Sequence, residues 1–200
     1  MKILIVGGNG TIGKKVKESL QDRHEIITAG RNSGDISVDI SDKNSIRKMF
    51  EQLKTVDACI CTAGTGFYGD YYSMTEEDML PGIKGKLIGQ MNLVLIGKDF
   101  LSREGSFTLT SGIAAEYPAK NGTAVAMING AINSFVIASS QELKNDLRIN
   151  AVSPGLVEDS FERYKGLFPG YNLAPMNKVV NAYILSTEGG VNGKILKVYS

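Results

Sequence analysis

The feature that most constrains this chain is a regular alternation of short apolar runs with longer segments of helical spacing. The runs are rich in β-branched residues and read KILIVGG (2–8), HEIITAG (24–30), ISVDIS (36–41), VDACICTAG (56–64), SFTLTS (106–111), LRINAVSPG (147–155) and KILKVYS (194–200). Short apolar runs that end in glycine, serine or proline are typical of buried strands. Strands that alternate with helices predict a parallel sheet covered by helices on both faces. We therefore expect an α/β fold with a doubly wound parallel sheet, in three α/β/α layers, as a single domain over residues 1–200.

The helical segments show where a ligand should bind. Expected helices are 11–22, 45–53, a long stretch roughly from 76 to 101 that could break at Pro81-Gly82, 122–144 and 176–186. Residues 156–174 are expected to form a loop. Ligands of doubly wound sheets bind beyond the carboxyl ends of the strands. The glycine, serine and proline clusters of this chain follow its strands, so the site is expected at that edge.

Composition excludes several classes of function. Apolar residues make up 42% of the chain, charged residues 22%, and the formal net charge is +1. This balance gives no electrostatic case for binding nucleic acid or an anionic membrane. No apolar run approaches the ~20 residues of a membrane span, and we expect no secretory signal, because strand-like residues begin at Ile3. Cys59 and Cys61 are expected to be reduced, buried thiols rather than a metal site, so a cytoplasmic protein without a metal is predicted.

The first strand leads into a glycine-rich turn. The segment GGNGTIG places Gly7, Gly10 and Gly13 between that strand and the start of a helix, with Thr11 and Ile12 at the helix start. Tight turning and close approach of backbone to a diphosphate both require missing side chains. The alternative is a tight turn that holds no ligand. In this context the motif favours a dinucleotide.

The end of the second strand distinguishes between two dinucleotides. A carboxylate at this place would hold the 2′-hydroxyl of NAD, but the sequence AGRNS has Gly30 followed by Arg31. A guanidinium is suited to a phosphate because of its planar, forked donors. Arg31, with Asn32 or Ser33, therefore predicts NADP, and NAD is less favoured. The alternative is a surface arginine in a turn.

With these motifs in order, the chain resembles the short-chain dehydrogenase/reductase family over essentially its whole length, with a Rossmann-like fold. GGNGTIG is similar to the family's glycine-rich turn, and CTAG (61–64) to its NNAG segment, although both asparagines are replaced. Ser111 ends the fifth strand where the family has its catalytic serine, and RINAVSPG resembles the segment beside the nicotinamide. The resemblance implies cofactor contacts from Thr11, Ile12, Asp39, Ile40, Ala63, Gly64, Pro154 and Gly155.

The same resemblance exposes a missing motif. In the family the serine is followed by YxxxK, in which the tyrosine is the acid and the lysine lowers its pKa and anchors the ribose. Here GTAVAMINGAINSFV places Val125 at the tyrosine and Asn129 at the lysine. Valine donates no proton, and asparagine offers the ribose hydrogen bonds without charge. The family's asparagine in the preceding long helix corresponds to Lys84 or Lys86.

Replacement groups for this motif are few. Ser111 could orient a substrate oxygen, and Tyr117, in AAEYPAK, could reach inward as a substitute acid, although a packing role is favoured. The loop tyrosines of TGFYGDYY, including Tyr68, are expected to form the wall of a substrate pocket. Lys86 could supply the missing positive charge, but a solvated helix lysine is the favoured interpretation.

Two functions remain open. The first is an NADP(H)-dependent oxidoreductase for a small carbonyl or alcohol substrate, with an atypical active site. The second is a catalytically inert NADP(H)-binding sensor or scaffold of the same fold. The helix after residue 122 is apolar nearly all round, which indicates burial on every side. A homodimer or homotetramer through the helices near 76–101 and 124–144 is therefore expected, as the resemblance also implies.

Overall fold

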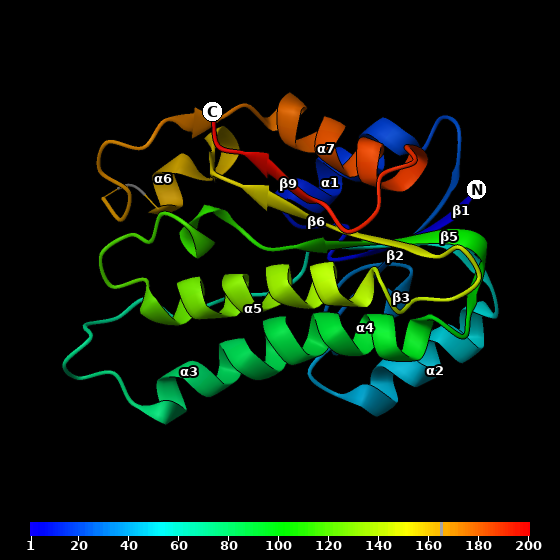
Figure 1. Ribbon diagram of the computed structural model, residues 1–200, viewed down its shortest axis with the longest axis horizontal. Helices are drawn as coiled ribbons and strands as arrows, with labels where there is room; N and C mark the ends of the chain where they lie inside the picture. Colours follow the sequence, from blue (N-terminus) through cyan, green and yellow to red (C-terminus); the bar gives the residue numbers. More distant parts are fainter. Residues whose placement is uncertain (165) are drawn as a thin grey trace.

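A seven-stranded parallel sheet forms the middle layer of the protein (Figure 1). The structure is a computed structural model that describes residues 1–164 and 166–200. The strand order is β3-β2-β1-β4-β5-β6-β9, and each of these neighbouring pairs is parallel. The strands are β1 (Lys2–Val6), β2 (Glu25–Gly30), β3 (Ile36–Ser37), β4 (Val56–Cys61), β5 (Leu101–Thr110), β6 (Arg148–Pro154) and β9 (Ile195–Val198). The predicted doubly wound fold is confirmed.

Helices cover both faces of this sheet. They are α1 (Thr11–Leu20), α2 (Lys43–Leu53), α3 (Glu76–Gly82), α4 (Gly89–Gly97), α5 (Thr123–Ser139) and α7 (Met176–Glu188). Figure 1 shows α1 and α7 on one face and α2, α4 and α5 on the other. Side chains alternate along a strand, so Ile3 and Ile5 of β1 join the core under α1 and α7, whereas Leu4 and Val6 join the core on the other face. Burial on both faces explains why the strand is continuously apolar.

The long helical stretch differs from its prediction in one important way. A capping box starts α3, in which the Thr75 side chain accepts from the backbone N–H of Asp78 and the Asp78 carboxylate accepts from Thr75. Pro81 lies inside α3 without ending the stretch, because a π-helical turn, η1 (Ile83–Ile88), follows and leads directly into α4. Such turns are rare and occur frequently at functional sites.

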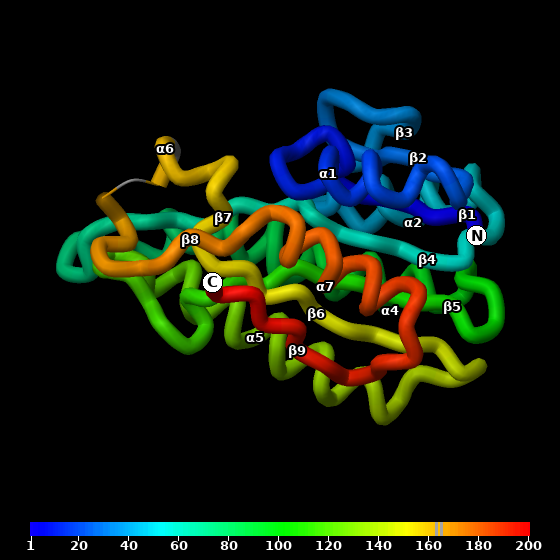
Figure 2. The backbone as a smooth tube through the Cα atoms, turned by 90° about the horizontal axis from the view of Figure 1, so that it is seen from above, coloured from blue at the N-terminus to red at the C-terminus, as the bar shows by residue number. Residues whose placement is uncertain are grey.

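Residue 165 of the predicted 156–174 loop lies outside the described residues, and the described parts of this segment contain more regular structure than predicted. A two-stranded parallel ribbon forms from β7 (Leu156–Val157) and β8 (Leu173–Ala174), and between them lie the 3-10 turn η3 (Glu158–Ser160) and the short helix α6 (Phe161–Tyr164). Viewed from above, α6 lies at the end of the molecule opposite the N-terminus (Figure 2). No helix among the residues described has both the length and the apolarity to cross a membrane.

Candidate active site

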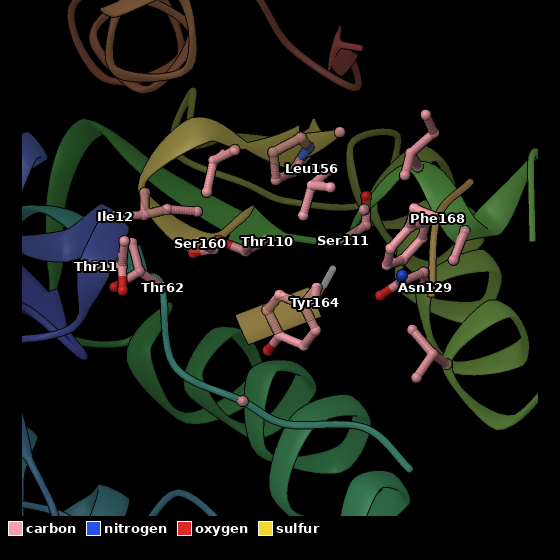
Figure 3. A pocket seen from close by; sticks show the side chains of 18 of the residues that line it. Thr11, Ile12, Thr62, Thr110, Ser111, Asn129, Leu156, Ser160, Tyr164 and Phe168 are labelled. Carbon is pink, nitrogen blue, oxygen red and sulfur yellow. The ribbon is translucent and has the colours of Figure 1, made fainter. Parts of the chain in front are cut away.

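A cavity of about 260 Å³ lies at the carboxyl end of the sheet. Its walls come from the turns that follow β1, β4, β5 and β6, and from η1, α5 and the 156–174 segment. Figure 3 shows Thr11, Ile12 and Thr62 at one end, Asn129 and Phe168 at the other, and Tyr164 between them in this view. The cavity therefore joins the glycine turn to the helix that lacks the YxxxK motif.

The glycine turn is closed by backbone contacts. Gly7 has φ +84°, in the region that favours glycine, and a Cβ on Gly13 would collide with the Gly7 carbonyl oxygen. Thr62 Oγ1 donates to that carbonyl oxygen over 3.0 Å, which ties the turn to the end of β4. Gly10 precedes α1 and gives it no side-chain cap. The first N–H groups of α1 therefore remain available to an anion, as a diphosphate site requires.

The predicted phosphate-reading residues lie on the surface beyond β2. Arg31 Nε is 3.4 Å from Asp39 Oδ2, and the Arg31 side chain is 66% exposed. Hydrogen bonds from Ser41 lower the pKa of Asp39, so this carboxylate stays charged at neutral pH. An exposed ion pair of this kind contributes little to stability. Arg31 is therefore able to leave Asp39 for a phosphate.

The other predicted cofactor residues lie either outside the cavity or in its wall. Ile40, Asn32, Ser33 and Ala63 lie outside it. Ile40 is buried, and its backbone oxygen lies where a side chain on Gly89 would be. Asn32 and Ser33 are exposed in the turn with Arg31, and Ala63 packs against Gly7. The cavity itself is lined by Thr11, Ile12, Gly64, Asn129, Pro154 and Gly155 from the predicted set.

Ser111 places a hydroxyl in the cavity. Its side chain is 3% exposed, and its Oγ has no hydrogen-bond partner among the described residues. Its backbone is fixed, since the N–H donates to Val152 O over 2.9 Å. A buried hydroxyl without a hydrogen-bond partner destabilises the folded protein, and a ligand that forms a hydrogen bond with it removes this cost. Ser111 is therefore suited to bind a ligand oxygen.

Lys86 is the residue whose surroundings differ most from expectation. Its ammonium donates to Asn129 Oδ1 over 2.7 Å and to the backbone oxygen of Ser111 over 3.1 Å. Desolvation lowers its pKa to about 8. The interpretation of Lys86 as a solvated helix lysine is wrong, because η1 turns this side chain into the cavity, whereas Lys84 is exposed.

Val125 lines the same cavity one turn before Asn129. The side chain is 7% exposed, so it is an apolar wall and not a surface residue. Both positions that the resemblance assigns to the catalytic tyrosine and lysine therefore face the cavity. Neither carries a group that titrates.

An aromatic wall closes the cavity on another side. Tyr68 packs against Tyr164 and Phe168, with ring centroids 6.3 Å and 6.2 Å apart. Burial raises the pKa of Tyr68 to about 12, so its phenol holds its proton tightly. Sequence reasoning missed Tyr164 and Phe168 because it placed them in an unstructured loop. Two aromatic residues in a segment that follows a strand at the expected ligand-binding edge of the sheet were the available signal for a cavity wall.

Tyr117 does not lie where a substitute acid is needed. The residue is 57% exposed, is not among the cavity-lining residues, and its ring packs edge-on against Tyr199. Its backbone oxygen accepts a hydrogen bond from the Tyr171 hydroxyl. The geometry therefore favours the packing interpretation over the catalytic one.

Known proteins are similar to this chain in sequence and architecture. The family model described as "Enoyl-(Acyl carrier protein) reductase" matches residues 10–178. The short-chain dehydrogenase/reductase ucsE of Acremonium sp. is 29% identical over 126 residues, which are 62% of this chain but only 45% of that relative.

Solved structures extend the likeness to the whole chain. The protein lin1944 from Listeria innocua is 43% identical, with a TM-score of 0.98 over 100% of both chains. A small-chain dehydrogenase in complex with NADPH is 25% identical, with a TM-score of 0.87 over 99% of this chain and 96% of its own. Because the family model matches well over half of the sequence, this protein belongs to the short-chain dehydrogenase/reductase family.

Proposed function

We propose that this protein is an NADP(H)-dependent oxidoreductase that interconverts a small carbonyl compound and its alcohol. The observation that carries the proposal is the meeting, in one cavity, of the start of α1, the unpartnered Ser111 hydroxyl and the Lys86 ammonium. A scaffold would not need a buried hydroxyl and a partly buried, desolvated cation at the ligand-binding edge. Strongly perturbed groups in a cleft are typical of functional sites.

The described residues fit a phosphorylated dinucleotide. The uncapped start of α1 would hold the diphosphate, and Arg31 would bind the 2′-phosphate through charge-assisted hydrogen bonds. Pro154 and Gly155, which line the cavity, would lie beside the nicotinamide. When bound, NADPH would supply a hydride. The 25% identical dehydrogenase solved with NADPH supports this choice.

The cavity walls limit the substrate. No Asp or Glu lines the cavity within the described ranges, and one wall, formed by Tyr68, Tyr164 and Phe168, is aromatic. Such a lining favours a small, largely apolar carbonyl compound whose oxygen binds at Ser111 and Lys86. A cationic substrate would lack any counter-charge there.

One observation favours a second candidate, an NADP(H)-binding sensor or scaffold without turnover. Val125, which the family resemblance places at the position of the acid, lines the cavity and offers no proton. A positioned acid typically contributes 10²–10⁴-fold to the rate. If no other group replaces it, the cavity binds the nucleotide but reduces nothing.

Calorimetric titration with NADPH and NADH tests the cofactor choice. We expect NADPH to bind more tightly, and Arg31→Ala to remove about 10- to 100-fold of that preference, because one to two charge-assisted bonds are lost. Arg103→Ala is the matched control, since Arg103 is also exposed and paired with an aspartate, Asp146. An Arg31→Ala variant that still prefers NADPH would contradict the assignment.

Turnover separates the two candidates. Consumption of NADPH should be followed with a panel of aldehydes, ketones and quinones. Reduction of any of them by the wild-type protein supports the oxidoreductase. Tight NADPH binding without reduction across the panel supports the sensor or scaffold.

We also propose a homodimer or homotetramer built on α4 and α5, which lie side by side in Figure 1. Leu95, Met127 and Ile137 are 49%, 46% and 53% exposed on these helices. Burial of such side chains against a second copy would be favourable. Light scattering should give a mass of at least two chains, and Ile137→Asp should lower it to one. A wild-type monomer at micromolar concentration would contradict this proposal.

A further inference from the structure

Lys86 is a cation without a counter-charge. Both of its hydrogen-bond partners in the described part of the chain, the Ser111 backbone oxygen and Asn129 Oδ1, are neutral. No ion pair joins it to a carboxylate among the described residues. The Cys61 thiol interacts electrostatically with Lys86, and burial raises the pKa of this thiol to about 12, so that it stays neutral. A desolvated ammonium without a counter-charge is energetically costly, and such groups are typical of functional sites.

We propose that Lys86 is the acid of this cavity and transfers its proton to the carbonyl oxygen of the substrate. This inference rests on the proposed oxidoreductase function and goes beyond it by assigning the proton donor. The lysine lies on η1 and its partner asparagine on α5. The protein therefore carries the lysine on a different helix from the one that the family resemblance predicts.

The hydrogen-bond geometry leaves Lys86 one donor for a ligand. An ammonium has three N–H groups and no acceptor. Two of these groups are directed to Ser111 O and Asn129 Oδ1. Lys86 lines the cavity together with the Ser111 hydroxyl. A carbonyl oxygen that accepts from Ser111 Oγ would therefore lie beside the remaining N–H of Lys86.

Asn129 acts as a positioning residue. Because an ammonium can only donate, Asn129 must present its side-chain oxygen to Lys86. This contact, over 2.7 Å, connects residues 43 positions apart. It holds the lysine against the end of β5 and turns the asparagine NH₂ group away from Lys86.

Two hydroxyl groups that line the cavity, those of Tyr68 and Ser111, are poorer acids than the Lys86 ammonium. Tyr68 has a pKa raised to about 12 by burial, whereas desolvation lowers the pKa of Lys86 to about 8. An acid works best when its pKa is near the working pH. Ser111 carries an alkyl hydroxyl, which orients but does not ionise in this range. Tyr117 lies outside the cavity.

The proposed reduction transfers a hydride to the carbonyl carbon and a proton from Lys86 to the carbonyl oxygen. The carbonyl carbon receives a hydride, with two electrons, for which NADPH is the reductant. The electron pair of the C=O π bond moves to oxygen, and this oxygen forms an O–H bond as the Nζ–H bond of Lys86 breaks. Lys86 is left as a neutral amine, and a proton taken up from bulk solvent restores the ammonium, so that the reduction consumes one NADPH and one solvent proton.

Three variants test the assignment. Lys86→Met removes the proton, Lys86→Arg keeps a charge that cannot be given up, and Lys84→Met is the control on the same turn, since Lys84 is exposed. Three quantities are measured: NADPH affinity by titration, kcat/KM for the best carbonyl substrate against pH, and the Lys86 pKa by NMR of ¹³C-labelled lysine. The NMR signal is assigned by its loss in Lys86→Arg.

The expected results are specific. In Lys86→Met and Lys86→Arg, kcat/KM for carbonyl reduction should fall about 10²- to 10⁴-fold, while both variants still bind NADPH. In Lys84→Met, kcat/KM should equal that of the wild type. Wild-type kcat/KM for reduction should decrease as pH rises through about 8, in step with the NMR titration of Lys86.

Other results would overturn the inference. Full activity in Lys86→Arg would mean that only the positive charge at this position matters. An NMR signal of Lys86 that titrates above pH 10 would mean that Lys86 is not the proton donor near neutral pH. Either result leaves the oxidoreductase proposal intact if the wild-type protein still reduces carbonyls. Wild-type protein that reduces none of the panel overturns both proposals. The NMR titration needs only folded wild-type and Lys86→Arg protein, so it holds even if Lys86→Met does not fold.

Discussion

The two ends of the cavity are built by different means. At the cofactor end, residues 7–10 form a tight turn that leads into α1, and the shape of this turn comes from glycine backbone in close contact. At the reactive end, the cavity is lined by side chains from η1, from α5 and from Ser111, which directly follows β5. There Lys86 meets Ser111 and Asn129 across 25 and 43 residues of sequence.

This difference explains which parts of the family pattern persist. A backbone turn that must approach a diphosphate has few alternatives, because any side chain would fill the space. A charge or a proton donor can come from whichever neighbouring helix reaches the cavity. The glycine turn is therefore retained, while the lysine lies on η1 and an asparagine remains on α5.

The largest expected effect is at the glycine turn. A Cβ on Gly13 would meet backbone atoms of Gly7 and Gly8, as well as Thr62 Oγ1, whereas a Cβ on Gly10 would meet only Gly7 O at 3.2 Å. Gly13→Ala should lower the free energy of unfolding by about 3 kcal/mol, at the upper end for overpacking. Gly10→Ala should lower it much less but weaken NADPH binding. Urea unfolding and calorimetry check both variants, and equal stabilities would show that the turn is not closed as described.

The lowered pKa of Lys86, at the reactive end, should make the free energy of unfolding depend on pH. In the unfolded chain Lys86 titrates near 10.5, and in the folded protein at about 8. Between these values the unfolded state binds more protons, so the wild type gains stability as pH rises, by no more than about 3 kcal/mol. Lys86→Met lacks this gain. Urea unfolding of both proteins from pH 7 to 10.5 should show their stability difference changing in that window; a constant difference would mean that the ammonium is not desolvated.

The smallest effects distinguish the hydroxyl inside the cavity from the one outside. Ser111→Ala should reduce carbonyl turnover about 10-fold or more, because the substrate oxygen loses a donor worth about 1.5 kcal/mol. The same change should leave stability nearly unaltered, since Ser111 Oγ has no partner among the described residues. Tyr117→Phe should alter neither quantity. Steady-state rates on both variants check this, and a loss in Tyr117→Phe larger than in Ser111→Ala would reverse the assignment.

The fold and the glycine turn after β1 were largely predictable from sequence. The alternation of strands and helices, and the turn at 7–13, depend on local chemistry that single segments reveal. Lys86 was identified only as an alternative, because a lysine in a helical pattern normally faces solvent. The π-helical turn that redirects it has no signature in the segment IKGKLI. The aromatic wall depends on how 156–174 folds back over the cavity, which is a tertiary contact.

A crystal structure of the protein with NADP⁺ is the most direct test of the cofactor site and of Lys86. We expect the diphosphate above the turn that leads into α1, Arg31 moved from Asp39 to the 2′-phosphate, and the Lys86 ammonium within ~3 Å of an oxygen atom at the nicotinamide end. An empty crevice above the glycine turn, or a different lysine or tyrosine beside the nicotinamide with Lys86 turned away, would contradict this expectation.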